Sequence, residues 1–151
     1  IMVDPNKVDT SSPIGSYRKA WLGYSNDPDI RKKAASGGIV TGVLAYMMET
    51  GKIDGALVCS SFFESGDFGY KIKIARTKEE IIASQSSKYF DIPLLKGLDQ
   101  LNEFNGRIAV VGLPSQINSL TRRMAKNDTL RNKVAFRIAL FCGHNSKKEL
   151  I

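Results

Sequence analysis

Three short segments hold side chains and backbone groups that are suited to bind a charged or polar ligand. The first is a Ser-Gly-Gly run ahead of a helical pattern, the second is a polar loop, and the third is a turn after an apolar strand. Each also has an ordinary structural explanation as a cap, a loop or a turn. The candidate ligand-binding residues are Ser36, Gly37, Gly38, Ser87, Lys88, Tyr89, Gly112, Pro114 and Gln116.

The first segment, Ser36, Gly37 and Gly38, opens the pattern IVTGVLAYMMETG, in which apolar residues recur at helical spacing. Backbone N–H groups at a helix start attract an anion, and glycines let the ligand approach the backbone. This pattern is typical of a phosphate site. The alternative is that Ser36 is an ordinary N-cap and the glycines form a tight turn.

The other two segments are also open to two interpretations. Ser87, Lys88 and Tyr89 offer a hydroxyl, an ammonium and a phenol to a phosphate, ribose or carboxylate, or they form a solvated loop with Tyr89 in the core. The run GLPSQ follows a buried strand and begins a helix, which is where open α/β sheets bind ligands, and Pro114 suits a first helical turn. Its serine is equally an ordinary helix-start residue.

Several other kinds of site are not indicated. His144 is the only histidine, and the sequence has no G-x-S-x-G elbow, no Walker loop and no G-x-G-x-x-G fingerprint. Glu79 and Glu80 fit a capping box after a threonine and do not form a catalytic pair. The two cysteines, Cys59 and Cys142, lie in apolar runs that predict buried thiols, and they are too few for a four-thiolate iron–sulfur cluster.

Composition indicates a globular protein. Of 151 residues, 42% are hydrophobic and 25% are charged. The net charge is +7, but the Lys and Arg residues form small scattered groups without interleaved aromatics, so nucleic-acid binding is not predicted. The longest apolar stretch, residues 39–48, is too short for a membrane span. With no signal-peptide pattern at the start, the sequence predicts a cytoplasmic protein.

Residues 1–15 read as an extended leader, and residues 16–151 as a single α/β domain, interpreted as a fragment of a longer protein. We expect a mixed, mostly parallel sheet with helices on its faces and one antiparallel hairpin between strands that begin near Ala56 and Tyr70. The apolar strand at residues 108–112 should be central. Strands are predicted at 16–25, 56–62, 70–76, 107–112 and 134–141, and helices at 28–34, from 39 to about 50, at 79–84, at 94–104 and, as one long helix, at 114–126.

Four blocks in order resemble the N-terminal and central portion of the coenzyme F420 hydrogenase/dehydrogenase beta subunits. They are RKKAASGGIVTGVLAYMMETGKIDGALV, SQSSKYFDIPLL, GRIAVVGLPSQINSL and IALFCGHN, and they cover about half the chain. The family pattern has an A-S-G-G helix start, a G-S-K-Y loop, a G-x-P-C-Q turn and an F-C-G strand end. Two positions depart from it: Ser115 replaces the cysteine of the turn, and Ser86 replaces the glycine of the loop.

The resemblance implies a flavin-dependent oxidoreductase subunit that holds FAD and passes electrons between an iron–sulfur chain and a second acceptor. Its partners would be an electron-donor protein or hydrogenase or dehydrogenase subunits. Members normally carry a [4Fe–4S] cluster, but Ser115 is a poor ligand, so we predict none in this chain. The candidate residues above fall on the flavin pocket, where we expect Lys88 and the Ser36, Gly37 and Gly38 turn to form one anion site. The alternative is a non-catalytic domain that binds a partner.

Overall fold

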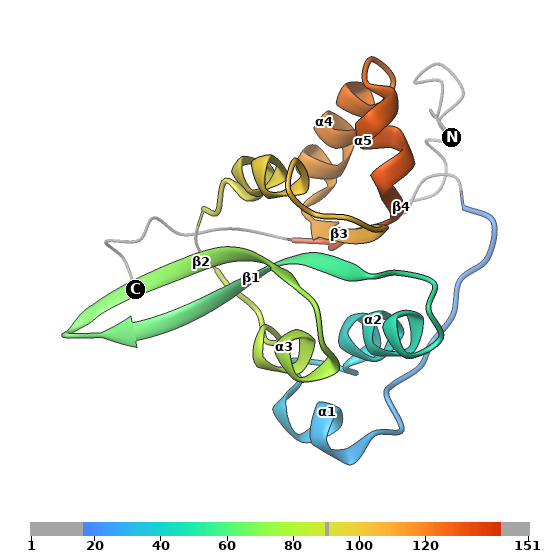
Figure 1. Ribbon diagram of the computed structural model, residues 1–151. Helices are drawn as coiled ribbons and strands as arrows, with labels where there is room; N and C mark the ends of the chain where they lie inside the picture. The colour runs from blue at the N-terminus through green and yellow to red at the C-terminus, as the bar shows by residue number, and fades with distance from the viewer. Residues whose placement is uncertain (1–16, 90, 143–151) are drawn as a thin grey trace, which may run out of the picture.

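A four-stranded sheet with the strand order β2-β1-β3-β4 organises the residues that this computed structural model describes, 17–89 and 91–142 (Figure 1). The strands are β1 (Gly55–Glu64), β2 (Asp67–Ala75), β3 (Ile108–Gly112) and β4 (Val134–Ala139). Strands β1, β3 and β4 are parallel, and β2 runs antiparallel to β1. The predicted mixed, mostly parallel sheet with one antiparallel hairpin is confirmed, and β3 lies inside the sheet as predicted. The proposed leader and His144 lie outside the described residues.

The β1–β2 hairpin is long and only its base is covered. Its two-residue turn places Ser65 at φ 54° and Gly66 at φ 82°, which is the combination of positive φ angles that matches the twist of a tight hairpin. Residues near Gly55 are buried, but the distal half of β1 is solvent-exposed, and the Phe63 side chain is 72% exposed. Figure 1 shows this half extending beyond the helices as an arm.

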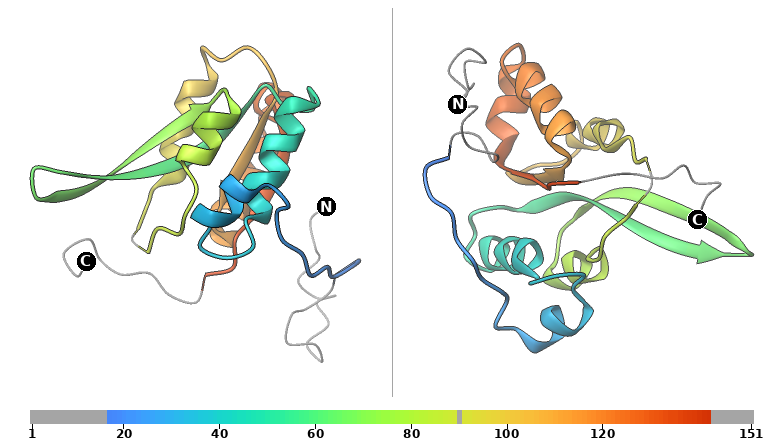
Figure 2. Two further views of the ribbon diagram at one scale, coloured as in Figure 1. Left: turned by 90° about the horizontal axis from the view of Figure 1, so that it is seen from below. Right: turned by 180° about the vertical axis from the view of Figure 1, so that it is seen from behind.

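Helices lie on both sides of the sheet and form two layers (Figures 1 and 2). In the first layer, α2 (Ile39–Glu49) and α3 (Lys78–Ala83) lie next to the sheet and α1 (Pro28–Lys33) lies beyond them. The second layer consists of the 3-10 helix η2 (Leu94–Leu101), α4 (Pro114–Met124) and α5 (Asp128–Lys133). Successive side chains of β1 point to opposite faces of the sheet, so the core consists of two clusters. Leu57 packs with the second helical layer, while Ala56 and Val58 pack with the first. No helix of the described residues is long and apolar enough to cross a membrane.

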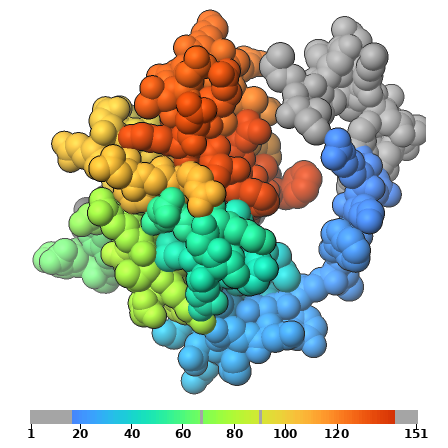
Figure 3. Space-filling model, turned by 45° about the vertical axis from the view of Figure 1, so that its right-hand side comes forward, coloured from blue at the N-terminus to red at the C-terminus, as the bar shows by residue number. Residues whose placement is uncertain are grey.

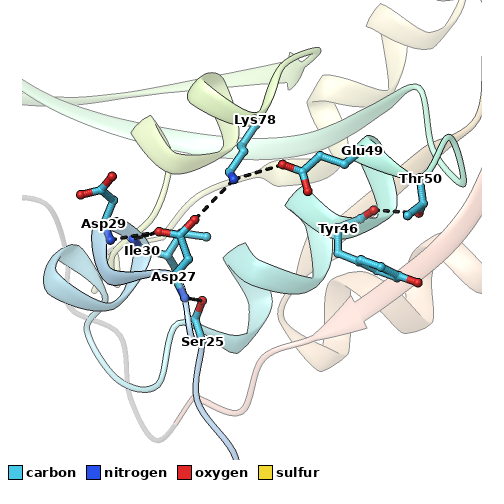
Figure 4. Close-up of polar contacts among 8 residues, drawn as sticks. All are labelled: Ser25, Asp27, Asp29, Ile30, Tyr46, Glu49, Thr50 and Lys78. Atoms are coloured by element: carbon cyan, nitrogen blue, oxygen red, sulfur yellow. Dashed lines mark hydrogen bonds and ion pairs between the residues drawn. The ribbon is translucent and has the colours of Figure 1, made fainter.

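Polar contacts join the three helices of the first layer (Figure 4). The Asp27 carboxylate caps α1 by accepting hydrogen bonds from the N–H groups of Asp29 and Ile30, at 3.0 and 3.2 Å. The Lys78 ammonium, at the start of α3, lies 3.4 Å from that carboxylate and 3.0 Å from the Glu49 carboxylate at the end of α2. These contacts fix the segment between α1 and α2, which contains the glycine run.

The capping box predicted for α3 is present in a shifted form. The Thr77 hydroxyl accepts a hydrogen bond from the Glu80 N–H at 3.2 Å. The Glu80 carboxylate accepts one from the Arg76 N–H at 2.6 Å, one residue earlier than the usual partner. The hydrogen bond lowers the pKa of the Glu80 carboxyl. The interpretation of this glutamate as a structural capping residue is therefore confirmed.

The predicted strand at residues 16–25 is wrong for the part that is described. Residues 17–25 form no strand, and the Trp21 side chain is 85% exposed. Figure 3 shows this blue segment running away from the orange and red helices. Its aromatic content suggested a strand, but no neighbouring strand of the described chain offers a ladder of partners, and only the Ser25 N–H reaches across, to the Gly37 carbonyl at 2.7 Å.

Three further boundaries differ from prediction. The helix expected at residues 94–104 is the 3-10 helix η2. The helix expected from Pro114 to residue 126 ends at Met124, two residues early, and α5 was not predicted; it starts where the Asn127 side chain accepts a hydrogen bond from the Leu130 N–H at 2.9 Å. Strand β4 ends at Ala139, so Cys142 lies beyond the strand and is exposed, contrary to the predicted buried thiol.

Candidate functional site

A pocket of about 660 Å³ opens at the edge of the sheet toward which the parallel strands β1, β3 and β4 run. Such an edge is where open α/β sheets place ligands, because loops and helix starts converge there. Eight of the nine candidate residues line it: Ser36, Gly37, Gly38, Ser87, Lys88, Tyr89, Gly112 and Gln116. Pro114 does not line the pocket and occupies the first turn of α4. The three segments therefore meet, although they are far apart in the sequence.

The start of α2 forms one wall. Gly38 is the N-cap, with φ 74° and no side-chain cap, so the interpretation of Ser36 as the N-cap is wrong. The Ser36 carbonyl instead accepts a hydrogen bond from the Arg31 guanidinium at 2.7 Å. Since no side chain caps α2, the first backbone N–H groups of the helix remain available on the wall of the pocket that Ile39 and Val40 also line.

Packing requires both glycines of this wall. A β-carbon on Gly37 would lie 2.9 Å from the backbone oxygen of Gly23, and one on Gly38 would lie 2.9 Å from Cγ2 of Ile30. Gly38 also has a left-handed conformation that L side chains disfavour. The turn is thus tight for structural reasons, and the same absence of side chains leaves the start of α2 accessible to a ligand.

The Lys88 side chain lies in the opposite wall, in the loop after α3. Its ammonium donates hydrogen bonds to the carbonyls of Ser84, Gln85 and Ser86, the last two at 3.0 and 2.9 Å. An ammonium has three N–H donors, so all of them are engaged. Burial lowers the pKa of Lys88. Lys88 and the glycine turn share one pocket, but the lysine primarily holds the end of α3 and its loop.

Cys59 of β1 lies beside this ammonium in the same pocket. The thiol is partly buried, and burial raises its pKa, although the neighbouring charge of Lys88 acts in the opposite direction. The thiol is therefore predominantly protonated near neutral pH and is a weak nucleophile. Cys142 also lines the pocket, so both cysteines of the chain contribute to it. Sequence reasoning missed this, since each was interpreted only as a small hydrophobic residue.

Gln116 connects two walls of the pocket. Its Oε1 accepts a hydrogen bond from the Leu113 N–H at 3.0 Å, and its Nε2 donates one to the Ile92 carbonyl at 2.7 Å. The amide thus ties the turn after β3 to the chain that follows the Lys88 loop. Gly112 permits this contact, because a β-carbon there would lie 3.0 Å from Oε1 of Gln116. Gln116 therefore positions the pocket wall.

The remaining lining is mostly apolar and carries no negative charge. Neither a carboxylate nor an imidazole is present among the described residues that line the pocket. Tyr89 lies at the rim and is 56% exposed, so the alternative that it is buried in the core is wrong. Ser115 is exposed and does not line the pocket. The further apolar lining, not singled out from the sequence, includes Ile39, Val40, Val58, Ile81, Ile92, Leu94, Val111, Leu140 and Phe141.

This arrangement can bind a ligand with an anionic part and a large apolar part. The uncapped helix start suits the anion, and the apolar walls suit a ring system. The described lining offers no carboxylate or imidazole as a general acid or base, which favours a ligand that carries its own reactive group. The geometry defines the class: an open α/β sheet with a cofactor-sized pocket at the carboxyl ends of its parallel strands.

Comparison with known proteins identifies the family within that class. Residues 20–99 match the model described as coenzyme F420 hydrogenase/dehydrogenase, beta subunit N-term, and residues 105–151 match the model for the C terminus of the same beta subunit. The chain belongs to the coenzyme F420 hydrogenase/dehydrogenase beta subunit family, which is a family of oxidoreductase subunits. The resemblance inferred from the sequence blocks is confirmed.

Individual relatives agree. The coenzyme F420 hydrogenase subunit beta of Methanosarcina barkeri is 31% identical over 87% of this chain and 46% of its own length. The coenzyme F420-dependent sulfite reductase of Methanocaldococcus jannaschii is 37% identical over 70% of this chain and 19% of its own length. A chain of the F420-reducing [NiFe] hydrogenase complex from M. barkeri superposes with a TM-score of 0.76 at 26% identity, covering 89% of this chain and 50% of that one. The chain thus spans half or less of these relatives.

Proposed function

We propose that the pocket binds FAD and that the chain is a module of a flavin-dependent oxidoreductase, passing electrons or hydride between a partner subunit and a second acceptor. The observation that carries this proposal is the meeting of the three family segments around one pocket with an uncapped α2 start and no described carboxylate. A dinucleotide with two phosphates requires an anion site and an apolar site in one cavity, and this pocket offers both.

The residues fit the two parts of such a cofactor. The backbone N–H groups at the start of α2 would hold the pyrophosphate, with Gly37 and Gly38 leaving room for it. The apolar side chains of Val58, Val111 and Leu140 would hold the flavin ring and exclude water from it. FAD supplies the redox chemistry when bound. The charge of Lys88 favours an anionic ligand even while its N–H groups bind carbonyls.

An iron–sulfur cluster does not fit this chain, and no step of the proposal uses one. A four-thiolate site needs more than the two cysteines present. No group of three potential metal ligands occurs among the residues that are described. The absence of a cluster remains a prediction. Iron and acid-labile sulfide analysis of protein purified without oxygen should find neither in stoichiometric amounts.

The flavin proposal is tested by adding FAD to the purified chain and following flavin fluorescence. We expect saturable binding. Ser87→Trp should raise the dissociation constant for FAD at least about tenfold, because the indole would occupy part of the pocket. Ser87 is exposed, so the larger side chain should not disturb the core. Ser119→Trp is the matched control, since Ser119 is exposed on α4 away from the pocket. No uptake of FAD, or equal binding by both variants, would contradict the proposal.

A second candidate is a non-catalytic module of the same family that binds a partner. It is favoured by Ser115, which stands where the family pattern has cysteine. A colourless protein that takes up no FAD but assembles with a hydrogenase or dehydrogenase subunit would support it. Because Ser115 does not line the pocket, the substitution itself leaves the proposed flavin site intact.

A further inference from the structure

A second hollow, of about 350 Å³, lies between η2 and α4 on the second helical layer. We call it the η2–α4 hollow. Its residues are Pro93, Leu94, Leu95, Lys96, Asp99, Gln116 and Arg123. Leu94 and Gln116 also line the candidate cofactor pocket, so these two residues form a common wall between the two cavities.

Cations near this hollow are satisfied by the protein itself. The Lys133 ammonium donates to the carbonyls of Leu101 and Phe104. The Arg137 guanidinium donates to the Thr121 hydroxyl at 2.7 Å. These side chains act as internal cross-links between η2, α4, α5 and β4, and their donors are not directed to an outside ligand.

The two cations of the hollow are different. Within residues 17–89 and 91–142, neither the Lys96 ammonium nor the Arg123 guanidinium makes a hydrogen bond or ion pair. Asp99 also lines the hollow and pairs with neither cation among the described residues, so the lining contains two cations and one carboxylate. They come from different elements, which means that the fold, and not local sequence, brings them together.

The donors that remain for a ligand come from these side chains. At the start of helix η2 the N–H groups of Leu94 and Lys96 already donate to the carbonyls of Ile92 and Pro93, at 2.8 and 2.9 Å. Lys96 provides a mobile point charge and Arg123 provides a planar set of donors that can contact two oxygens at once. A concave surface with these donors matches an anion with several oxygens.

We propose that the η2–α4 hollow binds a phosphate- or carboxylate-type anion through Lys96 and Arg123. Two sources share this chemistry. The anion is either an anionic group of the ligand that occupies the candidate cofactor pocket, reaching past the wall formed by Leu94 and Gln116, or a separate small anion. The site does not depend on whether the neighbouring pocket binds FAD.

The test is a titration of the chain with pyrophosphate at constant ionic strength, followed by backbone amide NMR. We expect saturable shifts at residues 94–96 and near Arg123. Lys96→Met and Arg123→Met should each weaken binding at least about tenfold, because each removes a charge-assisted contact. Arg122→Met is the matched control: it removes an exposed cation from the adjacent position of α4, which does not line the hollow. Its affinity should be unchanged.

A second arm repeats the titration with saturating FAD. If pyrophosphate still binds, the hollow takes a separate anion; if FAD blocks it, and FAD affinity also falls in Arg123→Met, one ligand occupies both cavities. Both results support the site. The proposal is overturned if pyrophosphate produces no saturable shifts, or if Arg122→Met weakens binding as much as Arg123→Met. Neither of these outcomes bears on FAD binding by the larger pocket.

Discussion

The two walls of the candidate pocket achieve the same concave shape by opposite means. At the start of α2, glycines pack closely against Gly23 and Ile30, and the helix is left without a side-chain cap. In the loop after α3, the Lys88 ammonium binds three carbonyls and satisfies the chain from within. The comparison shows that the lysine of a predicted ligand-binding motif can be a structural anchor, while the glycines, which could be explained as a tight turn, leave the first N–H groups of α2 uncapped.

The walls also differ in how they accommodate left-handed backbone. Gly38 has φ 74° and carries no penalty, whereas Ser86 has φ 89° with a side chain. Ser86 is the position at which the family pattern has glycine, so this chain retains an unfavourable conformation there. The hydrogen bonds from Lys88 to the carbonyl of Ser86 and to those of the two residues before it help to hold this conformation.

The largest effect is expected from Gly38→Ala. The new methyl group meets Ile30 in a conformation unsuited to alanine, so the free energy of unfolding should fall by about 2 to 4 kcal/mol. Gly51→Ala is the control, because Gly51 has φ 64° but no neighbour within 4 Å of a new β-carbon. It should lose only about 1 to 2 kcal/mol. Urea unfolding measures both, and equal losses would show that close packing at Gly38 is unimportant.

Lys88→Met should come next. Three carbonyls lose their donor, so we expect the free energy of unfolding to fall by about 1 to 2 kcal/mol, with FAD affinity falling as the loop loses its order. Lys71→Met removes an exposed lysine of β2 and should change stability by less than about 0.5 kcal/mol. Chemical denaturation and flavin titration are the measurements. A variant that loses affinity at unchanged stability would instead make Lys88 a direct ligand contact.

Ser86→Gly should stabilise the protein. Glycine adopts φ 89° freely, and after the larger entropy of the unfolded glycine chain is subtracted, a gain of about 0.5 to 1 kcal/mol is expected. Ser87→Gly is the matched control, since Ser87 has no positive φ, and it should be neutral or destabilising. The comparison between the walls would have to be revised if both variants shifted the denaturation midpoint in the same direction.

The smallest effect concerns the support beneath the glycine wall. Hydrogen bonding to the Ile30 N–H is the main cause of the lowered pKa of the Asp27 carboxyl. The ionised Asp27 carboxylate therefore contributes fully to the free energy of unfolding above its ordinary pKa of 3.8, and this contribution is lost as pH falls through the lower pKa of the folded state. Asp27→Asn should therefore lower the melting temperature at pH 7, and the difference should narrow in acid. Asp29→Asn controls for the loss of one charge in the same turn. A difference independent of pH would exclude this linkage.

Elements with strong local signals could be predicted from the sequence. The helical spacing after Gly38, the threonine and glutamate around α3 and the uniformly apolar β3 each specify their structure within a few residues. Residues 17–25 could not be assigned correctly, because a strand exists only where a neighbour pairs with it. The start of α5, which was not predicted, did have a signal, Asn127 followed by Asp128, which is a helix-start pattern.

The site was accessible to sequence reasoning only in part. Its three motifs could be recognised individually, and the resemblance to one family predicted that they belong to one pocket, while the rule that ligands lie at the carboxyl ends of strands applied only to the turn after β3. The structure alone shows that the Lys88 ammonium and the Gln116 amide already donate hydrogen bonds within the protein, since side-chain to carbonyl contacts such as those to Gln85 and Ile92 are not encoded in the spacing of a motif. Cys142 joins the pocket because β4 is shorter than its apolar run, which periodicity does not reveal.

The contrast between the covered base and the exposed arm of the β1–β2 hairpin also bears on the order of folding. The hairpin closes over the two residues Ser65 and Gly66, a step that takes microseconds in isolated hairpins. Pairing of β1 with β3 brings Gly55 next to Ile108. The chain between them loses conformational entropy when this long loop closes, before the contacts made within the sheet can offset the loss. We therefore expect the hairpin to form early and closure of the β1–β3 pair to be the slower, long-range step, on which the parallel sheet and the pocket at its edge depend.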